Sequence, residues 1–513
     1  MLFNSYEFIF LFLPVAFTVF YLIAGKNHNG ALAWLVLVSL FSYGYWSLYA
    51  LPILIGSVIF NYSSALFLAN PETKKRKLLL FFAITSNLSV LAFFKYANFF
   101  IANTNALRSF LGLATFDYLD VILPIGISFF TFTQMAFLMD SYHGKVKERN
   151  FLHYITFVTF FPYIFSGPII HHRQVMPQFS SPENSKLNGH KIMLGITIFV
   201  IGLSKKLLLA DNLSAYANLL FDGTKMGGVP HFMISWFGSL AYTFQLYFDF
   251  SGYSDMAVGL ALLFGVLIPI NFNAPFKATN IIDFWQRWHI SLTKYIGEYL
   301  YNPLTLRFTR LGFDRGPFID TLYSLMLPTI ITFLIIGIWH GPSWTYVLFG
   351  GMHGLFIIIN HLWRRFYPSR KTLNPIKISL NWLITFLSVN ASFVMFRSEN
   401  ISIAGEIYKG MLGLNGLNLS ENYSGGILKA IVRGIWQVEN MPIETILQSF
   451  LLLLLGFALV LLFPSSSKYV SLKQSDSQLF FVRNIWGPIA LAFLFVFSVM
   501  QLGKTSQFLY FQF

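Results

Sequence analysis

The sequence predicts an all-α polytopic membrane protein with about twelve spanning helices, since each crossing takes roughly 20 residues. The first observation is composition: of 513 residues, 55% are hydrophobic and only 11% are charged, and the mean hydropathy is +0.61. Soluble domains carry about 25% charged residues, so lipid covers most of this surface. The second observation is a series of apolar runs of spanning length along the whole chain. We therefore expect one integral membrane domain over residues 1–513.

Composition also excludes several classes of function. The chain has no cysteine, which excludes disulfides and thiolate chemistry. It has no GxSxG, P-loop or GxGxxG motif, so hydrolase, NTPase and dinucleotide-binding activities have no support. The net charge of +14 could suggest a nucleic-acid partner. In a membrane protein it reflects Lys and Arg placed in cytoplasmic loops, so we expect no nucleic-acid binding.

The first apolar run, Phe8–Ala24, resembles a signal peptide but lacks its flanks. Glu7 is the only charged residue before it, and no small-residue cleavage site follows. We predict a retained first helix. Later runs of spanning length begin near Ala31, Leu51, Leu78, Val121, Phe151, Ile192, His231, Met256, Leu322, Trp344, Ile378, Ile446 and Ile485.

Clusters of basic residues set the predicted orientation, because cytoplasmic loops are enriched in Lys and Arg. The strongest cluster is Lys74–Lys77, and three predicted crossings precede it, so the N-terminus should lie outside the cytoplasm. Two further groups should lie on the cytoplasmic side: Lys145, Lys147 and Arg149, and then Arg364, Arg365, Arg370, Lys371 and Lys377.

This orientation requires an even number of runs that do not span. The best candidates are Phe151–Ile170, which prolines interrupt, and Met256–Ile270, which is short and ends at Pro269. Non-helical backbone at membrane depth is tolerated only where protein or a water-filled cavity satisfies it, so two re-entrant or interfacial segments indicate a cavity. Both termini then lie outside, together with an outer loop over 397–445 that precedes C-terminal helices within 446–502.

Polar residues gather in the stretch Asn271–Tyr301. From Ile281 onward their spacing is helical: Asp283 and Arg287 are four residues apart, and Trp285, Trp288 and His289 share much of one face. One interpretation is an amphipathic helix at the membrane interface, with Trp and Arg at headgroup level. The other is a cytosolic lip that recognises an anionic cofactor. The candidate cofactor-binding residues are Trp285, Arg287, His289 and Lys294.

A metal site is not expected from the sequence. His171 and His172 are adjacent, and adjacent histidines on a helix point in different directions. The chain also lacks HExxH, a carboxylate triad and cysteine ligands.

The stretch "GIWHGPSWTYVLFGGMHG" (Gly337–Gly354) places His340 and His353 in otherwise apolar sequence. Ionisable residues within membranes are rare and mostly functional, and an imidazole exchanges protons near neutral pH. The alternative is that each histidine is a core residue satisfied by hydrogen bonds. Gly341-Pro342 should break the helix after His340, and an antiparallel hairpin would then bring both histidines toward one cavity.

Six motifs, in order between residues 93 and 354, resemble the membrane-bound O-acyltransferase family, in particular its bacterial alginate and peptidoglycan O-acetylating branch. They are "FFKYANFF", "LPIGISFFTF", "FFPYIFSGPI", "LYFDFSGYSDMAVGLALLFG", "DFWQRWHISL" and "GIWHGPSWTYVLFGGMHG". The resemblance implies a ring-like helical fold around a central cavity, with the catalytic histidine at His340 or His353 and the first position favoured. The sequence departs from the branch at Gln286, where Arg is common, and in "TKYIGEYLYNPL".

The resemblance also implies a reaction. An acetyl group would pass from cytosolic acetyl-CoA, a substrate and not a resident cofactor, to a hydroxyl of an extracytoplasmic polysaccharide or to a periplasmic SGNH-type acetyltransferase partner. The protein would lie in a bacterial inner membrane, with Arg287 and Lys294 near the donor phosphates. A transporter or flippase for a glycan or lipid-linked precursor, and a structural scaffold, remain as alternatives. The glycan, direct or relayed transfer, an acyl-histidine intermediate and the oligomeric state stay open.

Overall fold

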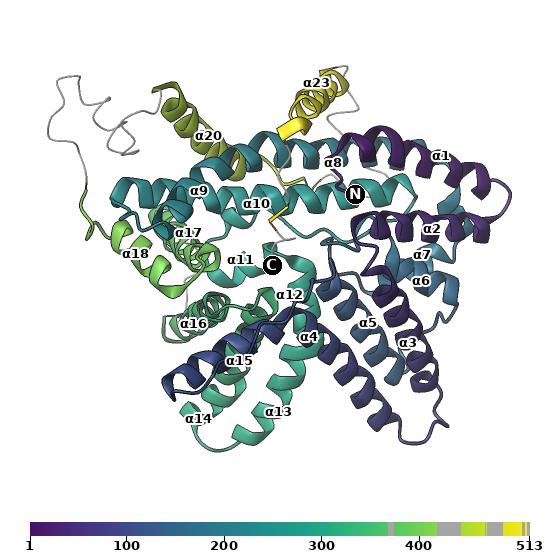
Figure 1. Cartoon of the computed structure of the whole chain (residues 1–513), viewed down its shortest axis with the longest axis horizontal. Helices are drawn as coiled ribbons and strands as arrows, with labels where there is room; N and C mark the ends of the chain where they lie inside the picture. Colours follow the sequence, from purple (N-terminus) through teal and green to yellow (C-terminus); the bar gives the residue numbers. More distant parts are fainter. Residues whose placement is uncertain (368–373, 418–442, 467, 469–485, 505–507, 510–513) are drawn as a thin grey trace. The chain divides into compact units, whose positions relative to one another are not determined.

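The computed structural model describes the chain except for residues 368–373, 418–442, 467, 469–485, 505–507 and 510–513. The described residues form helices and no strands (Figure 1). Two compact units are present, and we treat each by itself: unit 1 is Met1–Leu203, Tyr253–Ile270 and Lys473–Phe513, and unit 2 is Ser204–Gly252 and Asn271–Leu472. The predicted cytoplasmic residues Arg370 and Lys371 and most of the outer loop over 397–445 lie outside the described residues.

The helices fall into the two units as follows. Those chiefly in unit 1 are α1 (Leu13–Ala24), α2 (His28–Trp46), α3 (Leu51–Ala69), α4 (Arg76–Phe110), α5 (Ile127–Tyr142), α6 (Phe151–Thr159), α7 (His172–Phe179), α8 (Gly189–Ser204) and α23 (Trp486–Met500). Helix α10 (Phe232–Leu263) runs from unit 2 into unit 1. The others in unit 2 are α9 (Asp211–Lys225), α11 (Ile281–Arg287), α12 (Ile290–Ile296), α13 (Asn302–Gly312), α14 (Pro317–Thr321), α15 (Leu327–His340), α16 (Trp344–Phe366), α17 (Pro375–Arg397), α18 (Ile401–Met411) and α20 (Ile443–Leu462).

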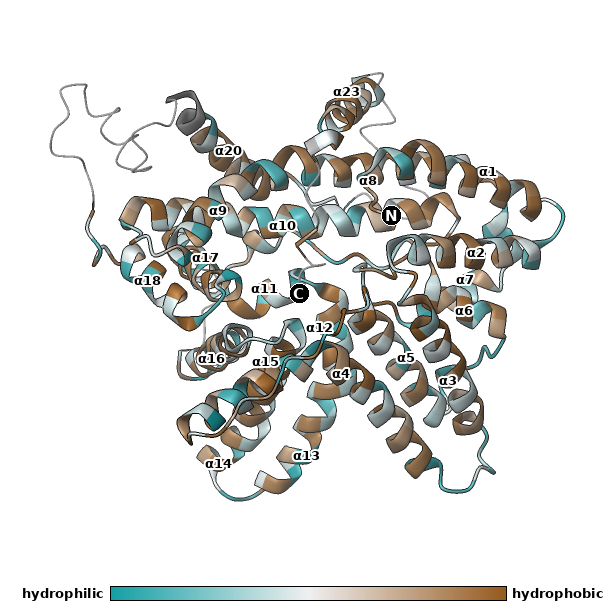
Figure 2. Ribbon diagram, in the orientation of Figure 1, coloured by the Kyte–Doolittle hydropathy of each residue, from teal (hydrophilic) through white to brown (hydrophobic). Residues whose placement is uncertain are grey.

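Hydrophobic residues dominate most of these helices (Figure 2). Six helical stretches of the described chain are long and apolar enough to cross a membrane: Leu51–Ala69, Arg76–Phe110, Gly189–Lys225, Pro317–His340, Trp344–Phe366 and Pro375–Arg397. Three shorter apolar helices are Phe8–Ala24, Gln448–Leu462 and Trp486–Met500. The first of these covers the run predicted as the first helix, and its retention stays a prediction. The total number of crossings stays a prediction.

Helix α5 forms the centre of unit 1. Nearly all of its residues are buried, because α3, α4 and α6 pack around it. The apolar run predicted from Val121 becomes helical only at Ile127. Gly126 precedes the helix with a φ of 73°, a left-handed conformation that glycine adopts without steric cost.

The two segments predicted to be re-entrant or interfacial differ in local structure. Within Phe151–Ile170, α6 ends at Thr159, and residues 160–170 continue as buried, largely irregular backbone. The run Met256–Ile270 does not begin a separate element, because α10 continues through Met256 to Leu263 without a break (Figure 1). That this run does not span the membrane stays a prediction. Gly259 does not interrupt this helix. It lies against the backbone of Gly195 in α8, where a Cβ atom would collide, so it permits close helix packing.

Candidate active site

Helices α15 and α16 form the predicted antiparallel hairpin and pack backbone to backbone. A Cβ atom on Gly337 would strike the carbonyl of Tyr346, and one on Gly350 would strike the carbonyl of Phe333. Small residues at such points allow apolar helices to approach closely. Gly337 of the GIWHG motif and Gly350 of the GGMHG motif therefore serve helix packing.

The connection between the two helices ends α15 at His340. Gly341 is extended, with φ −178° and ψ 166°, and Pro342 follows it with no N–H for a helical bond. Ser343 then caps α16, its Oγ accepting a hydrogen bond from the backbone N–H of Thr345. The break predicted at Gly341-Pro342 is confirmed, and it leaves His340 at a helix C-terminus.

His340 is 7% exposed and lies among aromatic rings. The centroid of its imidazole is 5.0 Å from that of Trp339, 5.8 Å from Phe349 and 5.1 Å from Phe396. These rings shield the imidazole from water.

His353 on α16 is fully buried, and both of its ring nitrogens make hydrogen bonds. The indole N–H of Trp285 donates to Nδ1 across 3.2 Å, and Nε2 lies 2.8 Å from Oγ of Ser392. An indole nitrogen only donates, so Nδ1 accepts and the proton of a neutral imidazole stands on Nε2. The Ser392 hydroxyl in turn donates to the carbonyl of Val389 across 2.8 Å. The whole chain of bonds is satisfied.

Phe349 joins the two histidines. Its ring centroid lies 4.7 Å from that of His353 and 5.8 Å from that of His340. The hairpin thus brings both predicted catalytic residues to one aromatic cluster.

The single helix predicted from Ile281 is wrong. Helix α11 ends at Arg287, Trp288 is extended, and His289 adopts a left-handed conformation with φ 46° before α12 begins at Ile290. Asn271 holds this break: its main-chain oxygen accepts from the N–H of Ile290 at 2.9 Å, and its Oδ1 accepts from the Ser291 hydroxyl at 2.8 Å. A regular 3.6-residue pattern does not predict a helix break that is stabilised by hydrogen bonds from a residue outside the helix.

The break turns the predicted interfacial residues inward. Trp285 and Trp288 are 5% and 6% exposed, and His289 is 1% exposed. His289 packs edge-on against Phe250, with ring centroids 4.8 Å apart, and also contacts Trp339. Its burial lowers the pKa of the imidazole to about 3, so the ring is neutral at pH 7.

The two cationic residues predicted for the donor face outward. Arg287 is about one-third exposed, and its Nε donates to Oδ1 of Asp283 across 2.8 Å. Lys294 is exposed on α12. The four predicted cofactor-binding residues therefore divide into an outward cationic pair and an inward pair, Trp285 and His289.

Sequence reasoning did not single out Ser392 or Lys206. Ser392 lies on α17, in an apolar span where a buried polar side chain is itself a signal. Lys206 is 1% exposed, and its Nζ lies 2.7 Å from Asp249 and 2.8 Å from Asp211. Such a buried cation needs carboxylate partners, and Asp249 was visible in the FDFSGYSD motif.

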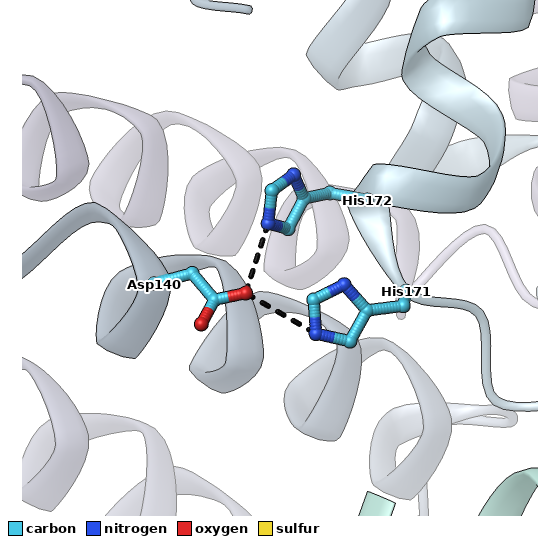
Figure 3. Close-up of side chains that lie close together, drawn as sticks. All are labelled: Asp140, His171 and His172. Carbon is cyan, nitrogen blue, oxygen red and sulfur yellow. Dashed lines mark hydrogen bonds and ion pairs between the residues drawn. The ribbon is translucent and has the colours of Figure 1, made fainter. Parts of the chain in front are cut away.

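The expectation that His171 and His172 diverge is also wrong. His171 is the extended N-cap residue of α7, with φ −91° and ψ 134°, and only His172 is helical. Both imidazoles therefore point toward Asp140 on α5 (Figure 3).

Comparisons with known proteins identify the family. The model of the membrane-bound O-acyltransferase family matches residues 38–396, a range that contains all the site residues above. Peptidoglycan O-acetyltransferase of Helicobacter pylori is 38% identical over 100% of this chain and 98% of its own length. Probable alginate O-acetylase AlgI of Pseudomonas aeruginosa is 35% identical over 87% of this chain and 84% of its own. The protein with the same name in Azotobacter vinelandii is 33% identical over 100% of both chains.

Proposed function

Because the chain belongs to the membrane-bound O-acyltransferase family, we propose that it moves an acetyl group from cytosolic acetyl-CoA across the membrane. The acceptor is a hydroxyl of an extracytoplasmic polysaccharide or a partner acetyltransferase. Support for acetyl as the acyl group comes from the names of its relatives, a peptidoglycan O-acetyltransferase and two probable alginate O-acetylases. Full-length coverage of the first relative supports a glycan of the cell envelope as the acceptor.

The observation that carries the site assignment is the bonding of His353. Nδ1 of His353 accepts a hydrogen bond from Trp285, and its Nε2–H donates one to Oγ of Ser392. Protonation of Nδ1 would therefore break the buried hydrogen bond from Trp285. We therefore place the general base at His340 and give His353 a positioning role.

His340 has a simple task in this reaction. Its neutral imidazole takes the proton of the acceptor hydroxyl as the oxygen attacks the thioester carbonyl and forms the new C–O bond. The C–S bond then breaks, and the imidazolium returns the proton to the departing CoA thiolate. At the C-terminus of α15, the negative end of the helix dipole stabilises the transient positive charge.

The donor approaches from the α11–α12 side in this proposal. Arg287 and Lys294 are accessible to the CoA phosphates, and an Arg guanidinium binds phosphate through paired hydrogen bonds. Trp285 and His289 are too buried for that role, so we place them at the acyl end of the pantetheine arm.

A thiol assay tests this proposal cleanly. Because the chain has no cysteine, every thiol that appears during incubation with acetyl-CoA is released CoA. We expect CoA release that rises when peptidoglycan fragments or alginate are supplied, and label from [acetyl-¹⁴C]acetyl-CoA on the glycan. Uptake of glycan into vesicles without CoA release would replace this proposal with the transporter or flippase.

A further inference from the structure

A second polar cluster lies in unit 1, outside the proposed acyl-transfer site. Asp140 near the end of α5 is fully buried. Its Oδ2 lies 3.0 Å from Nε2 of His172 and 3.2 Å from Nε2 of His171 (Figure 3). One ligand atom from each of the three residues falls within 4.8 Å of the others.

The position of the cluster follows from how α5 holds the irregular segment 160–170. At the start of α5, a Cβ atom on Gly126 would collide with the carbonyl of Ile164, so the segment touches the helix there. Asp140 comes 14 residues later, about 21 Å along the helix at 1.5 Å per residue. The segment therefore runs along α5. The contacts of His171 and His172 with Asp140 hold the C-terminal end of the segment against this helix. A link at this point joins the end of the segment to α5.

We propose that Asp140, His171 and His172 bind one divalent transition-metal ion of the Zn²⁺ class. Two imidazoles and one carboxylate are a ligand set that Zn²⁺ accepts, with a fourth position left for water. In a tetrahedral site with bonds of about 2.0–2.1 Å, neighbouring ligand atoms are about 3.3–3.4 Å apart. The two nitrogen-to-oxygen separations of 3.0 and 3.2 Å are already close to this spacing.

Metal binding requires both imidazoles to be neutral and the Asp140 carboxyl to be ionised. Coordination through Nε2 requires each ring to carry its proton on Nδ1.

The cationic side chains of Arg173 and Lys145 have to move away from the cluster when the metal ion binds. The Nε of Arg173 donates to Nδ1 of His171 across 3.2 Å, and Nζ of Lys145 lies 3.7 Å from Oδ1 of Asp140. The Arg173 side chain is exposed and that of Lys145 is 47% exposed, so both can turn toward solvent. Without an ion, the same side chains form a hydrogen-bonded cluster, and this is the competing state.

The test uses the full chain purified with a tag that contains no histidine and stripped with a chelator. We expect one equivalent of Zn²⁺ to be retained after desalting and to raise the melting temperature. We also expect Co²⁺ to give the visible absorption of a tetrahedral or five-coordinate complex. Asp140→Asn and His172→Gln should each lower the affinity for Zn²⁺ by tenfold or more.

His190→Gln is the matched control, because His190 is an exposed histidine outside the cluster. It should bind Zn²⁺ as the parent chain does. Sub-stoichiometric binding by the parent chain would overturn the proposal and leave a hydrogen-bonded cluster only. Equal binding by His172→Gln and the parent would also overturn it, since the ion would then sit on other histidines. The parent's own stoichiometry and Co²⁺ spectrum decide the question even where a variant folds poorly.

Discussion

The indole N–H of Trp285 donates to Nδ1 of His353, 68 residues further along the chain. This bond joins a residue predicted to bind the donor to one predicted to act in catalysis. It also selects the tautomer of His353 and, through Ser392, connects α11, α16 and α17.

Trp285→Phe separates the two roles of Trp285. Phenylalanine keeps most of the ring but removes the donor, leaving a buried acceptor unsatisfied at a cost of about 1–3 kcal/mol. If Trp285 positions His353, kcat should fall, the KM for acetyl-CoA should stay within about twofold, and Ser392→Ala should give the same pattern. A rise in KM alone for Trp285→Phe would instead assign the indole to the donor.

Glutamine substitutions rank the two histidines. An amide keeps a hydrogen-bonding group but takes no proton near neutral pH, so His340→Gln should be as inactive as His340→Ala, about 10²–10⁴-fold below the parent rate. His353→Gln retains a donor and an acceptor for Ser392 and Trp285 and should keep more activity than His353→Ala. Steady-state CoA release measures all four. An active His340→Gln beside an inactive His353→Gln would move the base to His353.

Arg287→Ala should weaken the use of acetyl-CoA. A cationic side chain bonded to a phosphate contributes about 1.5–3 kcal/mol, so the KM for acetyl-CoA should rise about tenfold or more. Asp283→Asn is the matched control, since it weakens the 2.8 Å ion pair but leaves the guanidinium in place. Equal KM increases in both variants would mean that Arg287 serves the ion pair and not the donor.

Single cysteines test the predicted orientation, and the absence of native cysteine gives no background. Lys75→Cys and Lys377→Cys replace exposed residues of the basic clusters. In intact spheroplasts both should resist an impermeant maleimide, because basic clusters lie on the cytoplasmic side. Asn422→Cys, outside the described residues, should react. Labelling at Lys75→Cys would place the donor side opposite to our assignment.

His289 should make the protein less stable in mild acid. Its pKa of about 3 lies below the ordinary 6.5, so below about pH 6.5 the unfolded chain binds a proton that the folded chain does not. The free energy of unfolding is therefore unaffected by His289 above about pH 6.5. It falls by up to about 1.4 kcal/mol per pH unit as the pH decreases toward 3.

Denaturation midpoints at about pH 5, 6 and 7 measure the effect. His289→Asn keeps a residue that tolerates the left-handed backbone, and its midpoint should depend less on pH. His190→Gln is the control, since His190 is exposed. Parallel pH profiles for the parent chain and His289→Asn would contradict the prediction.

Helical content and the hairpin were predictable because they depend on local signals. Trp344 begins a helix where the apolar run begins, and the predicted break at Gly341-Pro342 ends α15 at His340. Proline and glycine act on their own neighbours, so sequence alone reveals such ends.

The errors arise where distant residues decide the local structure. The left-handed turn at His289 depends on Asn271, and the close packing of α10 at Gly259 depends on Gly195 in α8. The pairing of Trp285 with His353 and of Asp140 with His171 likewise depends on tertiary packing. Periodicity describes one helix at a time and carries no information on such partners.

The glycine contacts of the α15–α16 hairpin have an electrical consequence. Two helices with no room for a methyl group at Gly337 and Gly350 have little room to slide, so the His340 imidazole stays at one depth in the bilayer. Moving one elementary charge across a membrane with a potential of 100 mV changes its free energy by about 2.3 kcal/mol. In the reaction proposed here the CoA phosphates stay on the cytosolic side, and the proton travels only from one bound oxygen to a nearby sulfur. Turnover should therefore proceed at the same rate in an energised and a depolarised membrane.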